Sequence, residues 1–304
     1  QLTTHVLADK LGVDENKVLA WEAGLLQPTF KQAQKWATAT NTPFAYLFLS
    51  QAPTLELAIP DLRTVANLDV VKPSLDLQET VTDALKKQSW LKEFRIEQAY
   101  KPLEFVGQFS STSKIEEVVF SLRKTLGLTN ATDHASKSDY LKDIIDRAES
   151  AGILIFRTGI VKSNTHRPLD VAEFRGFAIS DPIAPLVFIN TTDAPAARLF
   201  TLLHELAHIW IGSSGITNQV NNVSRDEEIF CNKVAGEFLV PKATFLRQWN
   251  DKIDWIQNLE PIATYFKVSK LVIAKRALDL GCLAYKEYNR YYLEELNQFR
   301  AKKS

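Results

Sequence analysis

The sequence predicts an α+β fold in which one small β-sheet interrupts a mostly helical chain. Apolar residues recur at helical spacing in the first half of the chain. Three short runs rich in β-branched and aromatic residues follow between residues 152 and 190, and helical periodicity then returns and continues to the C-terminus. A change in composition to a proline-punctuated connector marks the end of the first of four expected regions, which are residues 1–52, 53–108, 109–250 and 251–304.

The N-terminal region has the pattern of two helices joined by a tight turn. The sequence "THVLADKLGVDENKVLAWEAG" (residues 4–24) predicts a first helix, a turn at Gly12 and Val13, and a second helix. A third helix is predicted at about residues 30–40, before a connector punctuated by proline. We expect the apolar faces of the first two helices to contain Val6, Leu7, Leu11, Val18, Leu19 and Trp21.

Three further helices are predicted before the β-rich runs, at residues 75–98, 113–126 and 140–151. The helix at 113–126 starts with Ser113 followed three residues later by Glu116, which is a capping-box pattern. The buried stripe of the helix at 75–98 is expected to contain Leu77, Val81, Leu85, Trp90 and Leu91.

The runs "GILIFRTGIV", "FRGFAIS" and "PLVFIN" are expected to form one sheet. A helix should then begin at Asp193 and Pro195 and stop at Gly212. Another helix is predicted at about residues 224–239, ending at Pro241, and the C-terminal region is mostly helical.

Charge and composition limit the class of protein. Lysine and arginine number 36, as do aspartate and glutamate, so no overall field draws the chain to nucleic acid or to an anionic membrane. No apolar run reaches 18 residues and no signal-peptide pattern is present, so we expect a cytoplasmic protein without membrane contact. Two cysteines outside any CxxC pair agree with a reducing compartment.

The stretch "TLLHELAHIW" (residues 201–210) contains a histidine pair with a glutamate beside the first histidine. Helical positions four apart share one face, so His204 and His208 can direct ring nitrogens at one point. This pattern suits one zinc ion per chain, with Glu205 as the general base. The competing interpretation is an ordinary helix with two polar positions. We favour the metal site because this helix is apolar nearly all round, and buried imidazoles and carboxylates need partners.

A catalytic zinc ion usually has three protein ligands and one open position. We choose Glu228 as the third ligand, because Asn232 lies one helical turn later, where its side chain could hydrogen-bond the ligand. Glu227 is the second choice. The other residues considered are His134 and His166 on expected loops, Asp226 in the first turn of the helix, and Cys231 as a small buried packing residue.

Longer stretches around these residues resemble a known family. "PLVFINTTDAPAARLFTLLHELAHIW" (185–210), followed by "EEIFCNKVAGEFLVP" (227–241), resembles the ImmA/IrrE family of zinc metallopeptidases, and the similarity extends over about residues 110–280. The resemblance implies a zincin-like peptidase domain in which His204, His208 and Glu228 are the zinc ligands and Glu205 is the catalytic glutamate. The "AN" pair of the family's second motif is Cys231 and Asn232 in this chain.

The segment "LADKLGVDENKVLAWEAG" resembles the second and third helices of a phage-repressor-like (XRE-type) helix-turn-helix domain, whose first helix is expected but missing from residues 1–52. Residues 1–60 contain four lysines and five acidic residues, a net charge of −1, which disfavours DNA binding. Asn16 and Lys17, near the start of the presumed reading helix, are the expected DNA contacts. Dimerisation or docking of a partner protein is the alternative role of this region.

Together these features predict an intracellular regulatory zinc endopeptidase that cuts a repressor or a similar partner protein. The alternative is a DNA-binding regulator whose zinc domain acts as a sensor with little hydrolytic activity. The presence of Glu205 favours the enzyme, because a structural zinc site is closed by four ligands and needs no base. We expect "RGFAIS" or "PLVFIN" to pair with an extended substrate, and His166 is a candidate for stabilising the oxyanion.

Overall fold

The computed structural model describes residues 3–40, 42, 44–49, 74–128, 137–213 and 225–301. Helices predominate in these residues and strands are few, which confirms the predicted α+β class. The chain divides into two compact units, which are residues 1–57 with 72–79 and residues 58–71 with 80–304. The predicted domain boundaries at residues 52, 108 and 250 stay predictions, and His134 lies outside the described residues.

The first unit contains α1 (Thr4–Leu11), α2 (Glu15–Glu22), α3 (Phe30–Ala39) and the short 3-10 helix η1 (Phe44–Phe48). Side chains fix where its helices begin. The Asp14 carboxylate accepts the backbone N–H of Asn16 at 2.8 Å, so Asp14 caps α2 and the helix itself starts at Glu15. Thr29 and Gln32 form a complete capping box at the start of α3.

The small core of this unit corrects two residues of the predicted apolar face. The side chains of Val6 and Leu19 are 40% and 48% exposed, so their predicted burial is wrong. Each is next to a buried residue in the chain, and successive helical side chains point about 100° apart, which turns these two outward. The residues that do form the core are Leu7, Ala8, Leu11, Val18 and Trp21.

The second unit is built around a three-stranded sheet with the order β1 (Leu154–Thr158), β5 (Leu186–Asn190) and β4 (Gly176–Ile179). The central strand β5 runs parallel to β1 and antiparallel to β4. All three predicted runs therefore contribute to one sheet, as expected. The helices of this unit are α4 (Leu75–Glu97), which begins in the first unit, α5 (Ile115–Thr125), α6 (Lys137–Ser150), α7 (Pro195–Ile211), α8 (Arg225–Leu239), α9 (Lys242–Gln248), α10 (Trp255–Phe266), α11 (Lys270–Asp279) and α12 (Tyr285–Ala301).

The run "GILIFRTGIV" does not continue as one strand, which the sequence did not predict. It breaks at Gly159, and its end becomes β2 (Ile160–Val161), which pairs with β3 (Asn164–Pro168) in a separate sheet. A Cβ atom at Gly159 would lie 2.9 Å from both Thr191 Oγ1 and Thr192 Cγ2, so the chain passes too close to the β5–α7 connection for a side chain. His166 lies on β3 with an exposed side chain, so its predicted loop position is wrong.

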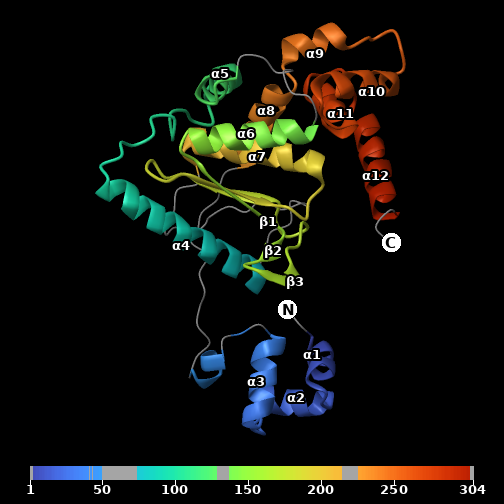
Figure 1. The fold of residues 1–304 in the computed structure, drawn as a ribbon. Helices are drawn as coiled ribbons and strands as arrows, with labels where there is room; N and C mark the ends of the chain where they lie inside the picture. Colours follow the sequence, from blue (N-terminus) through green and yellow to red (C-terminus); the bar gives the residue numbers. More distant parts are fainter. Residues whose placement is uncertain are drawn as a thin grey trace. The chain divides into compact units, whose positions relative to one another are not determined.

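The main sheet lies between helical layers, with α6 and α7 on one face and α4 on the other (Figure 1). Val187 and Ile189 of β5 pack into the hydrophobic cluster of α7. Phe188, between them in sequence, points to the opposite face and stacks on Phe177 with ring centroids 4.9 Å apart. This alternation gives both faces of the sheet an apolar layer.

The buried stripe of α4 differs from the prediction at Trp90, whose side chain is 69% exposed. The stripe continues through Ala84 to Gln88 instead, because the Gln88 amide donates a hydrogen bond to the carbonyl oxygen of Ala184 at 2.8 Å. Trp90 is two residues beyond Gln88 and so lies on nearly the opposite side of the helix. Leu85 and Leu91 are half-buried.

The predicted capping box at Ser113 and Glu116 is also wrong. Lys114 is the N-cap of α5 and makes no side-chain cap. The Ser113 hydroxyl instead accepts the backbone N–H of Ser110 at 3.0 Å, and so closes the preceding turn. Among the described helices, none is both long and apolar enough to cross a membrane.

Candidate metal centre

Helix α7 carries the histidine pair through the middle of the second unit. Pro195 occupies its first turn, where the missing N–H costs nothing, and Gly212 ends it in the left-handed conformation with φ of 67°. The helix begins at Pro195, as the sequence predicts, and its N-cap is Ala194, which makes no side-chain cap. The sheet covers one side of α7 and α8 covers another, so all of its residues from Thr201 to Trp210 are buried.

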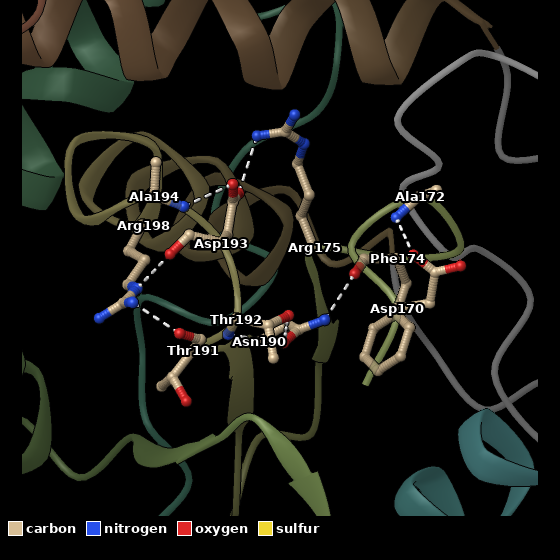
Figure 2. A network of polar contacts seen from close by, with 10 residues as sticks. All are labelled: Asp170, Ala172, Phe174, Arg175, Asn190, Thr191, Thr192, Asp193, Ala194 and Arg198. Carbon is tan, nitrogen blue, oxygen red and sulfur yellow. Dashed lines mark hydrogen bonds and ion pairs between the residues drawn. The ribbon is translucent and has the colours of Figure 1, made fainter. Parts of the chain in front are cut away.

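A network of polar contacts fixes the start of α7 to the sheet (Figure 2). The buried Asp193 carboxylate pairs with Arg175, just before β4, at 2.7 Å and accepts the backbone N–H of Ala194 at 2.8 Å. Arg198 of α7 donates to the backbone oxygens of Asp193 and Thr191 at 2.8 and 2.5 Å. These contacts position the helix on β4 and β5.

Three side chains converge where α7 meets the first turn of α8. The Nε2 atoms of His204 and His208 are 3.0 Å apart. The Glu228 carboxylate faces both rings, with Oε1 2.9 Å from His208 Nε2 and Oε2 3.2 Å from His204 Nε2. Both histidines are buried and Glu228 is half-buried.

The donor set fits a metal ion. Ligand atoms placed tetrahedrally around zinc at roughly 2.0–2.1 Å stand about 3.3 Å from one another. The separations of 2.9, 3.0 and 3.2 Å in this cluster are close to that spacing. Two imidazole nitrogens and a carboxylate oxygen aimed at one point are also the ligand types of hydrolytic zinc sites. His204, His208 and Glu228 could therefore hold a metal ion.

The charges of the cluster depend on one another when no metal is bound. Burial opposes the charged form of Glu228, but hydrogen bonds from His204 and His208 outweigh it and hold the pKa of that carboxyl well below its usual range. Burial would likewise lower the pKa of His208, but contacts with Cys231 and Glu228 raise it well above the ordinary value. A proton held there competes with a metal, so metal affinity falls as the pH is lowered.

Glu205 lies on the same helical turn as His204 and is buried against β4. Gly176 makes this approach possible, because a Cβ atom at that position would lie 3.2 Å from Glu205 Oε1. The same atom would be 2.7 Å from the carbonyl oxygen of Phe188 and 2.8 Å from Thr201 Cγ2. The missing side chain therefore lets α7 pack closely on the face of the sheet at β4.

Gly176→Ala is expected to destabilise the fold by about 1–3 kcal/mol, because the backbone oxygen of Phe188 cannot rotate away from the added methyl group. Gly236→Ala on α8 is the matched control. Its Cβ would meet its nearest neighbour, Arg276 Nη1, at 3.9 Å, and a helical alanine is favoured over glycine by about 0.5–1 kcal/mol. Free energies of unfolding from denaturant titration compare the two. Equal stability of the two variants would contradict this role of Gly176.

Other residues that the sequence suggested lie outside the convergence point. Asp226 and Glu227 precede Glu228 on α8, and neither belongs to the group of converging ligand atoms. Cys231 is fully buried in the hydrophobic cluster, as a packing residue would be, and it also contacts His208. Asn232 is half-buried one turn after Glu228, and its supporting role stays a prediction.

The comparison with protein families bears on this centre. Residues 148–278 match the peptidase family described as the IrrE N-terminal-like domain. The match covers the sheet, all three converging residues and Glu205, and it supports the resemblance to the ImmA/IrrE family. It does not extend to the first unit, whose helix-turn-helix assignment therefore stays a prediction. A search of curated proteins found no match to the chain.

Two residues at this centre were missed by sequence reasoning. Gly176 gave no signal, because its importance depends on the distance between β4 and α7. Ser213 places its hydroxyl 2.8 Å from Nδ1 of His208. The sequence indicated that Gly212 ends the helix, but it did not indicate that the side chain of the next residue, Ser213, contacts the His208 ring.

Proposed function

We propose that the chain is a zinc-dependent endopeptidase that hydrolyses a peptide bond in a partner protein. The observation that supports this best is the convergence of His204, His208 and Glu228 beside a buried glutamate, within a segment that matches a peptidase family. A site of three ligands leaves one coordination position open, as hydrolytic zinc sites require, whereas structural zinc sites are closed by four.

Glu205 is the proposed general base. It follows His204 directly in α7, and its side chain is buried next to the cluster. A bound zinc ion would supply a Lewis acid that polarises the scissile carbonyl and makes water more acidic. The Glu205 carboxylate would accept a proton from the attacking water and return it to the leaving amine. The low dielectric of its surroundings strengthens these charge interactions.

The edge strand β4 is the proposed substrate platform. β4 pairs only with β5 among the strands that the structure describes, and we propose that an extended peptide pairs with its other edge. Gly176, at the start of β4, lies against Glu205, which would bring a paired peptide to the base. The alternative strand from the sequence, "PLVFIN", is central in the sheet and has no open edge, so that expectation is wrong.

The proposed substrate class is a cytoplasmic regulatory protein such as a repressor. The described part of the first unit supports this proposal. α1 and α2 are joined through Gly12 and Asp14, as in a helix-turn-helix, and both Asn16 and Lys17 are exposed. These residues could contact DNA or a DNA-binding partner, and both roles remain proposals.

Glu205→Gln is expected to retain zinc and lose hydrolysis by about 10²–10⁴-fold, because only the proton-accepting group is removed. Zinc-loaded wild type and variant would be incubated with a proteome-derived peptide library, and new N-termini would be identified by mass spectrometry. We expect new termini with the wild type alone.

Two other outcomes would contradict the proposal. Equal cleavage by both proteins would show that Glu205 is not the base. If neither protein cleaved while both bound zinc, the alternative of a DNA-binding regulator with a zinc sensor would be favoured.

A further inference from the structure

The ring of His208 has a polar neighbour that the proposed hydrolysis does not use. The Ser213 hydroxyl lies 2.8 Å from Nδ1, while Nε2 on the other side of the ring faces His204 and Glu228. The two nitrogens of this one imidazole therefore have different partners. This difference decides which nitrogen can bind a metal, because a neutral imidazole has a proton on one nitrogen and a free lone pair on the other.

The end of α7 determines where Ser213 lies. Gly212 adopts the left-handed conformation, and its N–H points back to the carbonyl oxygens of His208 and Ile209. The N–H of Ser213 also donates to the carbonyl oxygen of His208, at 3.3 Å. The chain thus folds back over the last turn of the helix, and Ser213 contacts both the backbone and the ring of His208.

A second segment holds this helix end from outside. The N–H groups of Gly107 and Phe109 donate to the carbonyl oxygens of Ile209 and Trp210, both at 3.0 Å. Gly107 lies so close that a Cβ atom on Gly212 would be 3.0 Å from its Cα. Glycine at position 212 is therefore required by the close approach as well as by the backbone conformation.

We propose that Ser213 is a positioning residue that fixes His208 in the tautomer with the proton on Nδ1. The hydroxyl oxygen accepts the Nδ1–H, and the lone pair on Nε2 is then directed at the metal. Glu228, Glu205, Cys231 and His204 also lie near the ring; His204 and Glu228 contact Nε2, whereas the Ser213 hydroxyl contacts Nδ1. The inference rests on the proposed function, since it requires a metal at Nε2.

Ser213→Ala is expected to weaken zinc binding by about 10–100-fold, the usual effect of losing the partner that orients a ligand histidine. Zinc affinity would be measured by competition with a chelator of known affinity. Ser213→Thr keeps the hydroxyl and is expected to bind zinc nearly as tightly as the wild type.

Ser121→Ala is the matched control. The Ser121 hydroxyl accepts the indole N–H of Trp210 at 3.1 Å, so this variant also removes one hydrogen bond to the end of α7 but touches no proposed ligand. Its zinc affinity is expected to equal that of the wild type. Nitrogen-15 spectra of the zinc-loaded protein provide a second readout. A slowly exchanging Nδ1–H signal of His208 should be present in the wild type and lost in Ser213→Ala.

The outcomes separate this inference from the proposed function. A wild-type chain that binds no zinc would overturn both. Tight zinc binding by the wild type and by Ser213→Ala alike would overturn only the role of Ser213. An equal loss in Ser213→Ala and Ser121→Ala would show that the effect comes from a weakened helix end and not from the His208 tautomer, which would also overturn the inference.

Discussion

Glu228→Ala is expected to abolish tight zinc binding. The Glu228 carboxylate is the only anionic group that faces both histidine rings in the described cluster, at 2.9 and 3.2 Å from their Nε2 atoms. Removing it leaves only two neutral imidazoles as ligands. The loss of zinc affinity should therefore exceed the roughly 10–100-fold that follows from removing a residue that hydrogen-bonds a ligand. Equilibrium dialysis against buffered zinc at neutral pH measures the effect.

Glu227→Ala is the matched control for this experiment. Glu227 is the preceding residue in the first turn of α8 and carries the same charge, but it is not part of the converging group. It is expected to keep the zinc affinity of the wild type, because favourable charge at the helix start is worth only about 0.3–1 kcal/mol. Loss of zinc in Glu227→Ala with full binding in Glu228→Ala would reverse the ligand assignment.

Arg276→Ala is expected to lower the free energy of unfolding by about 3–5 kcal/mol, the usual cost of breaking a buried ion pair from one side. Arg276 of α11 pairs with Glu237 near the end of α8, and its Nε–H also donates to the carbonyl oxygen of Val240 at 2.9 Å. Arg276 is buried, and this burial lowers the pKa of its guanidinium. Without it, Glu237 would keep a half-buried charge that has lost its cation.

Lys275→Ala tests whether the large loss of stability expected for Arg276→Ala comes from the burial of its ion pair. Lys275 is the neighbouring residue, and it pairs with Asp279 at the surface, where its side chain is 47% exposed. An exposed pair of this kind contributes about 0–1 kcal/mol. Denaturant titrations of both variants should therefore differ by several kcal/mol. Similar losses in the two would contradict a stabilising role for the buried pair.

Glu228 and Glu237, the residues affected in these two predictions, both belong to α8. Arg123 of α5 also holds the last turn of α8, through a hydrogen bond of 2.5 Å to the carbonyl oxygen of Phe238 and a guanidinium 4.5 Å from its ring. Two arginines thus stabilise the negative end of a helix whose first turn presents Glu228. The rigid placement of α8 against α7 explains how a half-buried carboxylate remains aimed at two buried rings.

The sequence predicted the metal centre better than its surroundings. Helical spacing places His204 and His208 on one face independently of tertiary contacts. The separate helix that carries Glu228 was predicted from its own sequence pattern. The convergence of these residues needed only two helices packed side by side. The limits of α7 followed from Pro195 and Gly212, whose backbone requirements are local.

The features that the sequence did not predict depend on tertiary contacts. Trp90 is apolar yet exposed, because Gln88 donates a hydrogen bond to a carbonyl oxygen in the β4–β5 connection, which sets the orientation of α4. Gly159 divides one apolar run between two sheets, because the β5–α7 connection passes over it. Glycine is required at position 176 because β4 and α7 lie too close together there for a side chain. None of these causes leaves a periodic or spacing signal in the chain.

X-ray absorption at the zinc edge of the zinc-loaded wild-type protein tests the central claim most directly. We predict one zinc ion per chain with nitrogen and oxygen neighbours only, at roughly 2.0–2.2 Å, supplied by two imidazoles, one carboxylate and an oxygen from solvent. A sulfur neighbour at about 2.3 Å, which Cys231 would have to provide, or a protein that takes up no zinc at neutral pH, would contradict the proposed catalytic site.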